Sequence, residues 1–231
     1  MTEYRTVLFD LDHTLWDYDT NSRETLQEMF GDFALTQTLG TGFEPFYQTF
    51  EEINTDLWTR YDQGLIPRET IRKDRFRNII GRFGVDDQTL SEKLSDAYVE
   101  RSPTRSALID GAMDLLYYLK PRYELFVVTN GFEEVQLTKV RSSGIGEFFR
   151  EIIISDRVGH KKPSPLIFDH VLDKYGYDRS HAVMIGDNLL TDIAGARNAG
   201  IDTVFFNPKA TKHGDSVTHE ISHLRQLQGI L

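Results

Sequence analysis

The chain of 231 residues is 39% hydrophobic and 27% charged, enough apolar material for one large domain or a domain with an insert. Its net charge of −10 argues against a binding groove for a nucleic-acid polymer but is compatible with a small phosphorylated metabolite. The absence of cysteine excludes disulfides and thiolate metal sites. No apolar run approaches the roughly 20 residues that span a bilayer, and no signal-peptide pattern is present. We therefore expect a soluble cytoplasmic protein without a membrane partner, either a monomer or a weak homodimer.

The first predicted strand, TVLFD (6–10), leads directly into two aspartates, Asp10 and Asp12, with one leucine between them. Because side chains alternate along an extended chain, both carboxylates point the same way. Paired carboxylates suit Mg²⁺, which takes oxygen ligands, and a carboxylate can also act as a covalent nucleophile toward phosphate. If this motif stood alone, two aspartates that merely cap a turn would be the better interpretation.

The interval 16–106 contains no convincing strand but several amphipathic helical patterns, which predicts an inserted all-helical domain. Helices are expected over 67–84, which opens with a proline and closes at a glycine, and over 87–102. Residues 1–15 and 107–231 are then expected to form the catalytic core.

Aromatic residues recur with a period near 3.6 between Phe43 and Tyr61 in this insert. Such a stripe usually packs one helix against another, and we expect this for most of its members. Trp58 or Tyr61 is a candidate contact for a substrate base. Trp16 and Tyr18, just after the two aspartates, are alternative candidates.

Beyond the insert, strands alternate with helix-length segments, which predicts a doubly wound, Rossmann-like parallel sheet in an α/β fold. Ligands of such sheets bind beyond the carboxyl ends of the strands. The tail THEISHLRQLQGIL predicts a further short strand and a closing helix with its N-cap at Ser222. The predicted strands are YELFVVT (123–129), EIIIS (151–155), AVMIG (182–186) and DTVFF (202–206).

Polar residues that could hold a phosphate follow these strands. Thr129 and Asn130 close the second strand and precede a glycine, a turn whose hydroxyl, amide and backbone N–H groups can cradle phosphate oxygens. Lys161 and Lys162 precede a Pro-x-Pro, and one of them could reach inward to neutralise phosphate and carboxylates. Asp187 follows the fourth strand directly. Each motif alone is explained as well by an ordinary turn or a solvated loop, but together they occupy the expected ligand edge.

The motifs resemble those of the haloacid dehalogenase-like (HAD) superfamily. DLDHTL resembles its first motif, VVTNG its second, KPSP its third and GDNLLTD its fourth, in the right order and over essentially the whole chain. The helical insert resembles the cap that defines one subclass. The cap segment NTDLWTRYDQG, together with TNGF and ISDRVGHKKPSPLIFD, is similar to the noncanonical pyrimidine 5′-nucleotidase branch.

This resemblance implies roles for five residues. Asp10 is expected to attack phosphorus and form an aspartyl-phosphate, while Asp12 protonates the leaving oxygen and then activates water. Thr129 and Asn130 are expected to bind the transferring phosphoryl group. The lysine directly before the proline is Lys162, which is therefore preferred over its neighbour as the catalytic and phosphate-binding lysine.

The resemblance also implies a Mg²⁺ cofactor held by Asp10, the main-chain carbonyl of Asp12, and Asp187, with Asp192 supporting the metal or the lysine. As an acid, Asp12 must hold a proton near neutral pH. We expect the neighbouring charge of Asp10 to raise the pKa of Asp12 and a bound metal to oppose this.

The expected function is Mg²⁺-dependent hydrolysis of a phosphomonoester, of which a pyrimidine nucleoside 5′-monophosphate is the favoured example. A sugar-phosphate phosphatase or a phosphomutase shares these motifs, and a non-catalytic binding protein of the same fold is a further alternative. Haloacid dehalogenases lack the second aspartate of the first motif, and a phosphonatase would need a Schiff-base lysine in the cap. Cap closure is expected to hinge near 16–20 and 103–108.

Overall fold

The computed structural model describes residues 3–231 and divides into two compact units. One unit comprises the residues up to Tyr18 together with Ser106–Leu231, and the other comprises Asp19–Arg105. The first carries the sheet and the second is helical. The core predicted from the sequence, 1–15 and 107–231, ends within three residues of this division.

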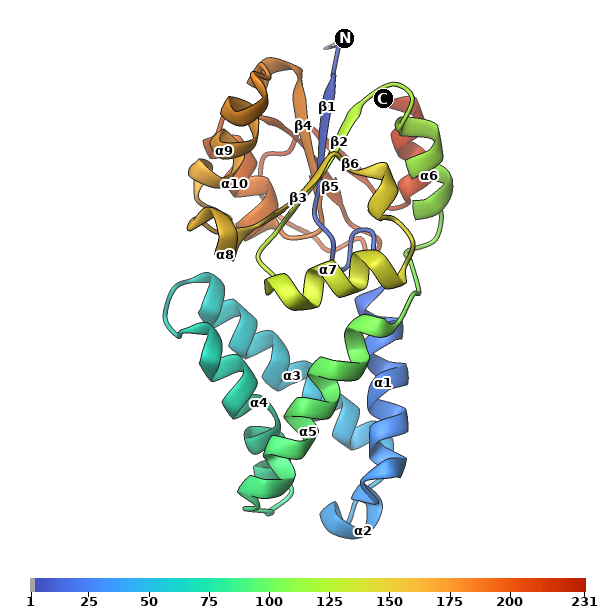
Figure 1. Cartoon of the computed structure of the whole chain (residues 1–231), viewed down its shortest axis with the longest axis vertical. Coiled ribbons are helices and arrows are strands. Elements are labelled where there is room, and N and C mark those ends of the chain that lie inside the picture. Colours follow the sequence, from blue (N-terminus) through green and yellow to red (C-terminus); the bar gives the residue numbers. More distant parts are fainter. Residues whose placement is uncertain (1–2) are drawn as a thin grey trace. The chain divides into compact units, whose positions relative to one another are not determined.

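A parallel six-stranded sheet with the order β3-β2-β1-β4-β5-β6 forms the centre of the first unit (Figure 1). This confirms the predicted doubly wound fold, and five strands lie within one residue of their predicted bounds. Their runs of branched and aromatic residues suit a sheet that is buried on both faces. The strands are β1 (Thr6–Phe9), β2 (Glu124–Thr129), β3 (Glu151–Ile154), β4 (Ala182–Gly186), β5 (Asp202–Phe206) and β6 (His219–Ile221).

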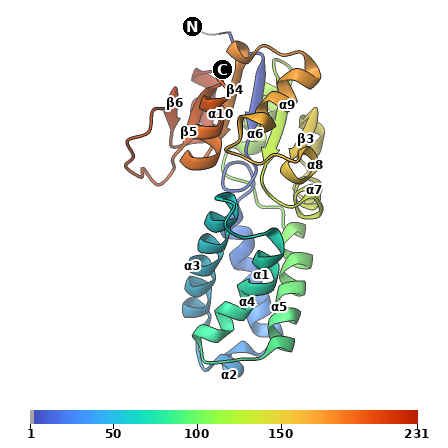
Figure 2. The same ribbon diagram turned by 90° about the vertical axis from the view of Figure 1, so that its left-hand side faces the viewer.

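Alternating side chains of the strands bury two separate apolar clusters, one on each face of the sheet. Val7 and Phe9 of β1 pack in the cluster that includes residues of α6 (Ala112–Leu119), α7 (Glu133–Ser142) and the 3₁₀ helix η5 (Leu224–Gly229). Leu8 points the other way and packs in the cluster with α9 (Pro165–Tyr175) and α10 (Ala194–Asn198). These two helices cover the face of the sheet opposite to α6 (Figures 1 and 2). Short helical turns complete the unit: η2 (Gly146–Phe148), α8 (Ser155–Val158), η3 (Arg179–His181) and the π-helical turn η4 (Leu189–Ile193).

The closing helix begins one position later than predicted. Its N-cap is His223 and not Ser222. The side chain of Gln226, in the first turn, reaches back and accepts hydrogen bonds from the backbone N–H groups of His223, at 2.9 Å, and Ser222, at 2.8 Å. The predicted cap at Ser222 is therefore wrong by one residue.

The helical unit buries most of its aromatic stripe between its own helices, as predicted. Phe50 of α3 packs against Phe76 of α4 and Tyr98 of α5, with ring centroids 6.1 and 5.2 Å away. Tyr61 is also buried and Trp58 half-buried, and a contact between either side chain and substrate stays a prediction. The helices are α1 (Tyr18–Asp32), α2 (Leu35–Leu39), α3 (Phe43–Asp62), α4 (Arg68–Arg82), α5 (Gln88–Arg101) and η1 (Ser102–Thr104).

Within residues 3–231, the structure has no helix that combines the length and the apolar character needed to cross a bilayer.

Candidate active site

The predicted site residues gather at the carboxyl edge of the sheet. Asp10 follows β1, Thr129 ends β2, and Asp187 follows β4. Because β1 pairs in parallel with both β2 and β4, the ends of these three strands lie side by side. The backbone N–H of Asp10 still donates to the carbonyl of Ile185, at 2.9 Å, so the first aspartate is held in line with the sheet.

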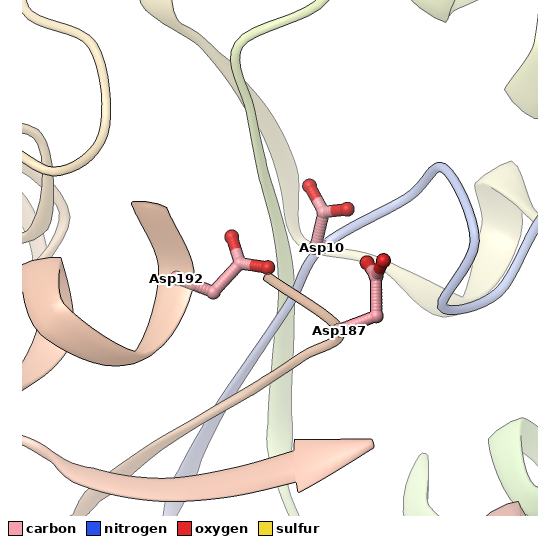
Figure 3. A group of neighbouring side chains, drawn as sticks. All are labelled: Asp10, Asp187 and Asp192. Carbon is pink, nitrogen blue, oxygen red and sulfur yellow. The ribbon is translucent and has the colours of Figure 1, made fainter. Parts of the chain in front are cut away.

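Three carboxyl groups form an acidic cluster at this edge. Asp10, Asp187 and Asp192 each place an oxygen within 4.8 Å of the others (Figure 3). The hydroxyl of Thr14 donates to Asp187 Oδ1 at 3.1 Å and helps to orient it. Such a set of hard oxygen donors fits Mg²⁺. The sequence predicted Asp10 and Asp187 in this group. It gave Asp192 only a supporting role, although the structure places its carboxyl group in the cluster.

Lys162 enters the cluster from the loop before α9. Its Nζ lies 2.5 Å from Asp10 Oδ1 and 2.6 Å from Asp192 Oδ1, and the side chain is 2% exposed. Burial alone would lower the pKa of this lysine, but the two carboxylates outweigh burial and raise it. The ammonium group is therefore charged, and it links the predicted nucleophile to Asp192. The neighbouring Lys161 is half-buried.

Asn130 holds the backbone of this lysine. Its amide Nδ2 donates to the carbonyl of Lys162 at 2.9 Å, and its Oδ1 accepts from the N–H of Lys162 at 2.8 Å. The side chain thus ties the end of β2 to the lysine loop. Its predicted contact with a phosphoryl group stays a prediction, as does that of Thr129.

The segment after β4 explains how Asp192 returns to the strand end. Asn188 caps η4 with its side chain, accepting from the N–H groups of Leu190 and Thr191 at 2.9 and 3.1 Å. Asp192 Oδ2 accepts in turn from the N–H of Asn188 at 3.0 Å. A Cβ at Gly186 would lie only 2.3 Å from Asp192 Oδ2, so the glycine makes room for the carboxyl group.

Replacing Gly186 with alanine is expected to displace Asp192, lowering the free energy of unfolding by about 1–3 kcal/mol, as overpacking of buried sites does. Urea denaturation of Gly186→Ala beside the wild type measures this loss. Gly214→Ala is the matched control, since a Cβ there meets nothing within 4 Å. Equal stability of all three proteins would contradict the packing argument.

The second aspartate lies in a separate contact network. Lys139 Nζ lies 2.5 Å from Asp12 Oδ1, and Gln136 Nε2 donates to Asp12 Oδ2 at 2.8 Å. The same Nε2 donates to the hydroxyl of Thr129 at 2.7 Å. Sequence reasoning did not find Gln136 or Lys139. Their one available signal is that two polar residues three positions apart share one face of a helix that follows the Thr-Asn-Gly turn.

The pKa values of Asp10 and Asp12, the two aspartates after β1, are shifted in opposite directions. Burial raises the pKa of Asp10 well above its usual range, Lys162 opposes the shift, and the charges of Asp192 and Asp187 add to it. Burial together with Asp192 raises the pKa of Asp187 to about 6. A divalent cation bound at this cluster would favour the ionised carboxylates, so its binding would release protons.

For Asp12, burial raises the pKa, but the charge of Lys139 and the hydrogen bonds from Lys139 and Gln136 outweigh it, so that the pKa is lowered. The sequence predicted that the charge of Asp10 raises the pKa of Asp12 and that a bound metal opposes this. The lowering comes instead from Lys139 and Gln136 of α7, which the sequence did not reveal.

The motifs, the sheet order and this cluster agree with the comparison with known families. The model of the family described as haloacid dehalogenase-like hydrolase matches residues 4–200. The chain belongs to this family. The resemblance of the four motifs to the HAD superfamily is thereby confirmed, and the fold and family together identify the chain as a HAD hydrolase.

Relatives of this HAD hydrolase include two nucleotidases. Pyrimidine 5′-nucleotidase YjjG of Escherichia coli (strain K12) is 31% identical, with 97% of this chain and 96% of YjjG covered. Pyrimidine 5′-nucleotidase PynA of Streptococcus pneumoniae (strain ATCC BAA-255 / R6) is 32% identical, with 89% and 84% covered. The HAD-hydrolase YfnB of Bacillus subtilis (strain 168) is 32% identical, with 100% and 97% covered.

A crystal structure of YfnB bound to magnesium superposes on the chain with a TM-score of 0.90 at 30% identity. The match covers 99% of this chain and 98% of YfnB, and interdomain movement is described for that protein. The fold of the HAD hydrolase is thus shared over its whole length with a protein that binds magnesium.

Proposed function

We propose that the chain is a magnesium-dependent phosphomonoesterase that hydrolyses nucleoside 5′-monophosphates and prefers pyrimidine nucleotides. The observation that carries the proposal is the pair of aspartates after β1, each held by its own lysine. Asp10 contacts Lys162 in the acidic cluster, whereas Asp12 contacts Lys139 outside it. Two carboxylates in different surroundings suit two different roles, one as nucleophile and one as acid and base.

In the first proposed step, a carboxylate oxygen of Asp10 attacks phosphorus and the ester P–O bond breaks. The leaving oxygen takes its proton from Asp12, and Lys162 and Thr129 bind the phosphoryl oxygens. The cluster of Asp10, Asp187 and Asp192 would supply oxygen ligands to Mg²⁺, which when bound would help to neutralise charge on the phosphoryl group. The Asp12 carbonyl stays a predicted further ligand.

In the second step, the Asp12 carboxylate takes a proton from water, whose oxygen attacks phosphorus and returns the electron pair to Asp10. The lowered pKa of Asp12 keeps the carboxyl group ionised, which is the form that accepts a proton. For the first step Asp12 must carry a proton, and the negative charge that a substrate phosphate brings beside it favours the protonated form.

The substrate class rests on the relatives. Two relatives at 31 and 32% identity are pyrimidine 5′-nucleotidases, and both matches cover most of each chain. Asp12 is half-buried and held by Lys139 and Gln136. Its presence supports phosphoryl transfer over dehalogenation, since the dehalogenase motif lacks this aspartate.

A substrate panel tests the proposal. We expect phosphate release from UMP, CMP and TMP with higher kcat/KM than from AMP, GMP or sugar phosphates, and loss of all turnover in EDTA. A preference for sugar phosphates would show that these, and not nucleotides, are the substrate class. Isomerisation without phosphate release would indicate a phosphomutase. Halide release from a 2-haloacid would indicate a dehalogenase. No turnover of any ester between about pH 6 and 9 would indicate a binding protein.

A further inference from the structure

The Asp12 carboxylate is held at both of its oxygens by residues of α7. Lys139 Nζ lies 2.5 Å from Oδ1 and Gln136 Nε2 lies 2.8 Å from Oδ2. A carboxylate fixed at both oxygens by a cation and an amide has little freedom to rotate about its last bond. The contacts therefore define the orientation of the carboxyl group and not only its charge.

Lys139 is itself fixed in place. Its side chain is buried, and Nζ lies 4.3 Å from the ring centroid of Trp16 and 5.6 Å from that of Tyr18. Trp16 is fully buried in the core, so the ring face that Lys139 contacts cannot move away. An ammonium group above aromatic rings gains a cation–π interaction in addition to its ion pair. Trp16 thus packs in the core and against Lys139, and its contact with a substrate base stays a prediction.

Gln136 connects Asp12 to the neighbouring strand. Its side chain is fully buried, and Nε2 donates one hydrogen to Asp12 and the other to Thr129 Oγ1. Because a carboxylate only accepts hydrogen bonds, the amide nitrogen must face Asp12. Thr129 Oγ1 also accepts from the N–H of Gly131 at 3.1 Å, which leaves its own hydrogen to donate. One glutamine thus orients both the proposed acid–base residue and the proposed phosphoryl-binding hydroxyl.

Gly131 provides the space that this arrangement requires. A Cβ at this position would lie 2.1 Å from Gln136 Nε2 and 2.4 Å from its Cδ, distances that no side-chain contact allows. The glycine of the Thr-Asn-Gly turn is therefore needed for the passage of the Gln136 side chain. This is a second observation, independent of the hydrogen bonds, that the site is built around the glutamine.

We propose that Gln136 and Lys139 are positioning residues that hold the Asp12 carboxyl group in the orientation from which it exchanges a proton with the ester and with water. They also keep it apart from the cluster of Asp10, Asp187 and Asp192. The inference rests on the proposed phosphomonoesterase function, and it adds to that function two residues of α7 that act through Asp12.

The two proposed steps depend differently on Asp12, and this provides a test. An alkoxide leaving group, as in UMP, needs the proton of Asp12 when its P–O bond breaks. 4-Nitrophenolate is a stable anion and leaves without it. Hydrolysis of the aspartyl-phosphate needs Asp12 as base in both cases. If Asp12 is misplaced, phosphoryl transfer from UMP to Asp10 becomes slow. Transfer from 4-nitrophenyl phosphate stays fast, and the enzyme then accumulates as the aspartyl-phosphate because its hydrolysis is slow.

The experiment compares Lys139→Met with Arg141→Met, an exposed cation on the same helix, in the full-length protein with saturating Mg²⁺. For Lys139→Met we expect kcat with UMP to fall by about 100-fold, the lower end of what a positioned acid–base group contributes, with little change in KM. With 4-nitrophenyl phosphate it should release a burst approaching one nitrophenolate per enzyme before a slow steady rate. Wild type and Arg141→Met should show neither change. Lys139→Arg should recover part of the UMP rate because it keeps the cation.

Gln136→Met, close to glutamine in shape, provides a second test if Lys139→Met does not fold by circular dichroism. It should show the same burst. The inference would be overturned if Lys139→Met or Gln136→Met showed no burst and had the same ratio of UMP to nitrophenyl phosphate turnover as Arg141→Met. That result would leave the proposed function intact. A wild-type protein that turns over neither ester would overturn both.

Discussion

Asparagine in place of Asp10 is expected to abolish phosphate release while the chain stays folded. Asparagine keeps the size of the side chain but removes the negatively charged oxygen that attacks phosphorus. Loss of a covalent nucleophile lowers kcat in hydrolases by on the order of 10⁶-fold. Phosphate release from UMP, measured with enough enzyme to detect a rate that low, checks the loss.

The stability of Asp10→Asn distinguishes a lost nucleophile from a lost fold. Because burial and two neighbouring carboxylates raise the pKa of Asp10, a neutral amide relieves repulsion, and we expect no loss of Tm without added metal. Lys162 keeps its contact with Asp192 at 2.6 Å. Added Mg²⁺ should stabilise the wild type, by about 2.7 kcal/mol at one hundred times its Kd, and the variant much less.

Asp114→Asn is the matched control, since Asp114 is exposed on α6. It should retain the kinetics and the metal-induced shift in Tm of the wild type. Turnover by Asp10→Asn within about tenfold of the wild type, a loss of only about 1.4 kcal/mol in transition-state stabilisation, would remove Asp10 from the role of nucleophile.

The part of the site that lies at strand ends could be predicted from the sequence. Apolar runs locate buried strands, and a parallel sheet brings their carboxyl ends to one edge, so Asp10, Thr129 and Asp187 had to be neighbours. Lys162 followed from its place before a proline in a motif of known order. These inferences need only the direction of the parallel strands and the alternation of side chains along each strand.

The part of the site supplied by helices could not be predicted in this way. Lys139 and Gln136 lie 127 and 124 positions from Asp12 along the chain, and which face of α7 turns toward the sheet depends on tertiary packing. Asp192 reaches the cluster because a π-helical turn and the absence of a Cβ at Gly186 bring its carboxyl group to the end of β4. A sequence pattern carries neither the turn geometry nor the free space.

The contacts of α7 also change how the two aspartates are to be understood. Proximity along the strand suggested that the charge of Asp10 would raise the pKa of Asp12. In the structure each carboxylate has its own ammonium group, Lys162 for Asp10 and Lys139 for Asp12, and the difference in their pKa values follows from burial and from these partners. The spacing of two residues places both side chains at the same edge, and each is paired with a different cation, which is the basis for the two roles proposed for them.

Removing the ammonium group of Lys162 is expected to lower both stability and turnover. The lysine lies between Asp10 and Asp192 and is 2% exposed, so Lys162→Ala leaves two buried carboxylates without their cation. Removing one partner of a buried ion pair lowers the free energy of unfolding by about 3–5 kcal/mol. Chemical denaturation in EDTA measures this loss, and Mg²⁺ should restore part of it because the ion offers the same carboxylates a positive charge.

Turnover separates the structural from the catalytic contribution of this lysine. If Lys162 binds the phosphoryl oxygens, kcat/KM for UMP should remain about 10²–10³-fold below wild type even in Mg²⁺ that restores stability, the range for loss of one donor to a developing negative charge. Lys162→Met, which fills the space without the charge, should lose as much activity as Lys162→Ala. Lys161→Ala, next to it in the loop, should behave as wild type. Wild-type kinetics for Lys162→Met would mean that the ammonium group only balances the charge of the acidic cluster and that another donor binds the phosphate.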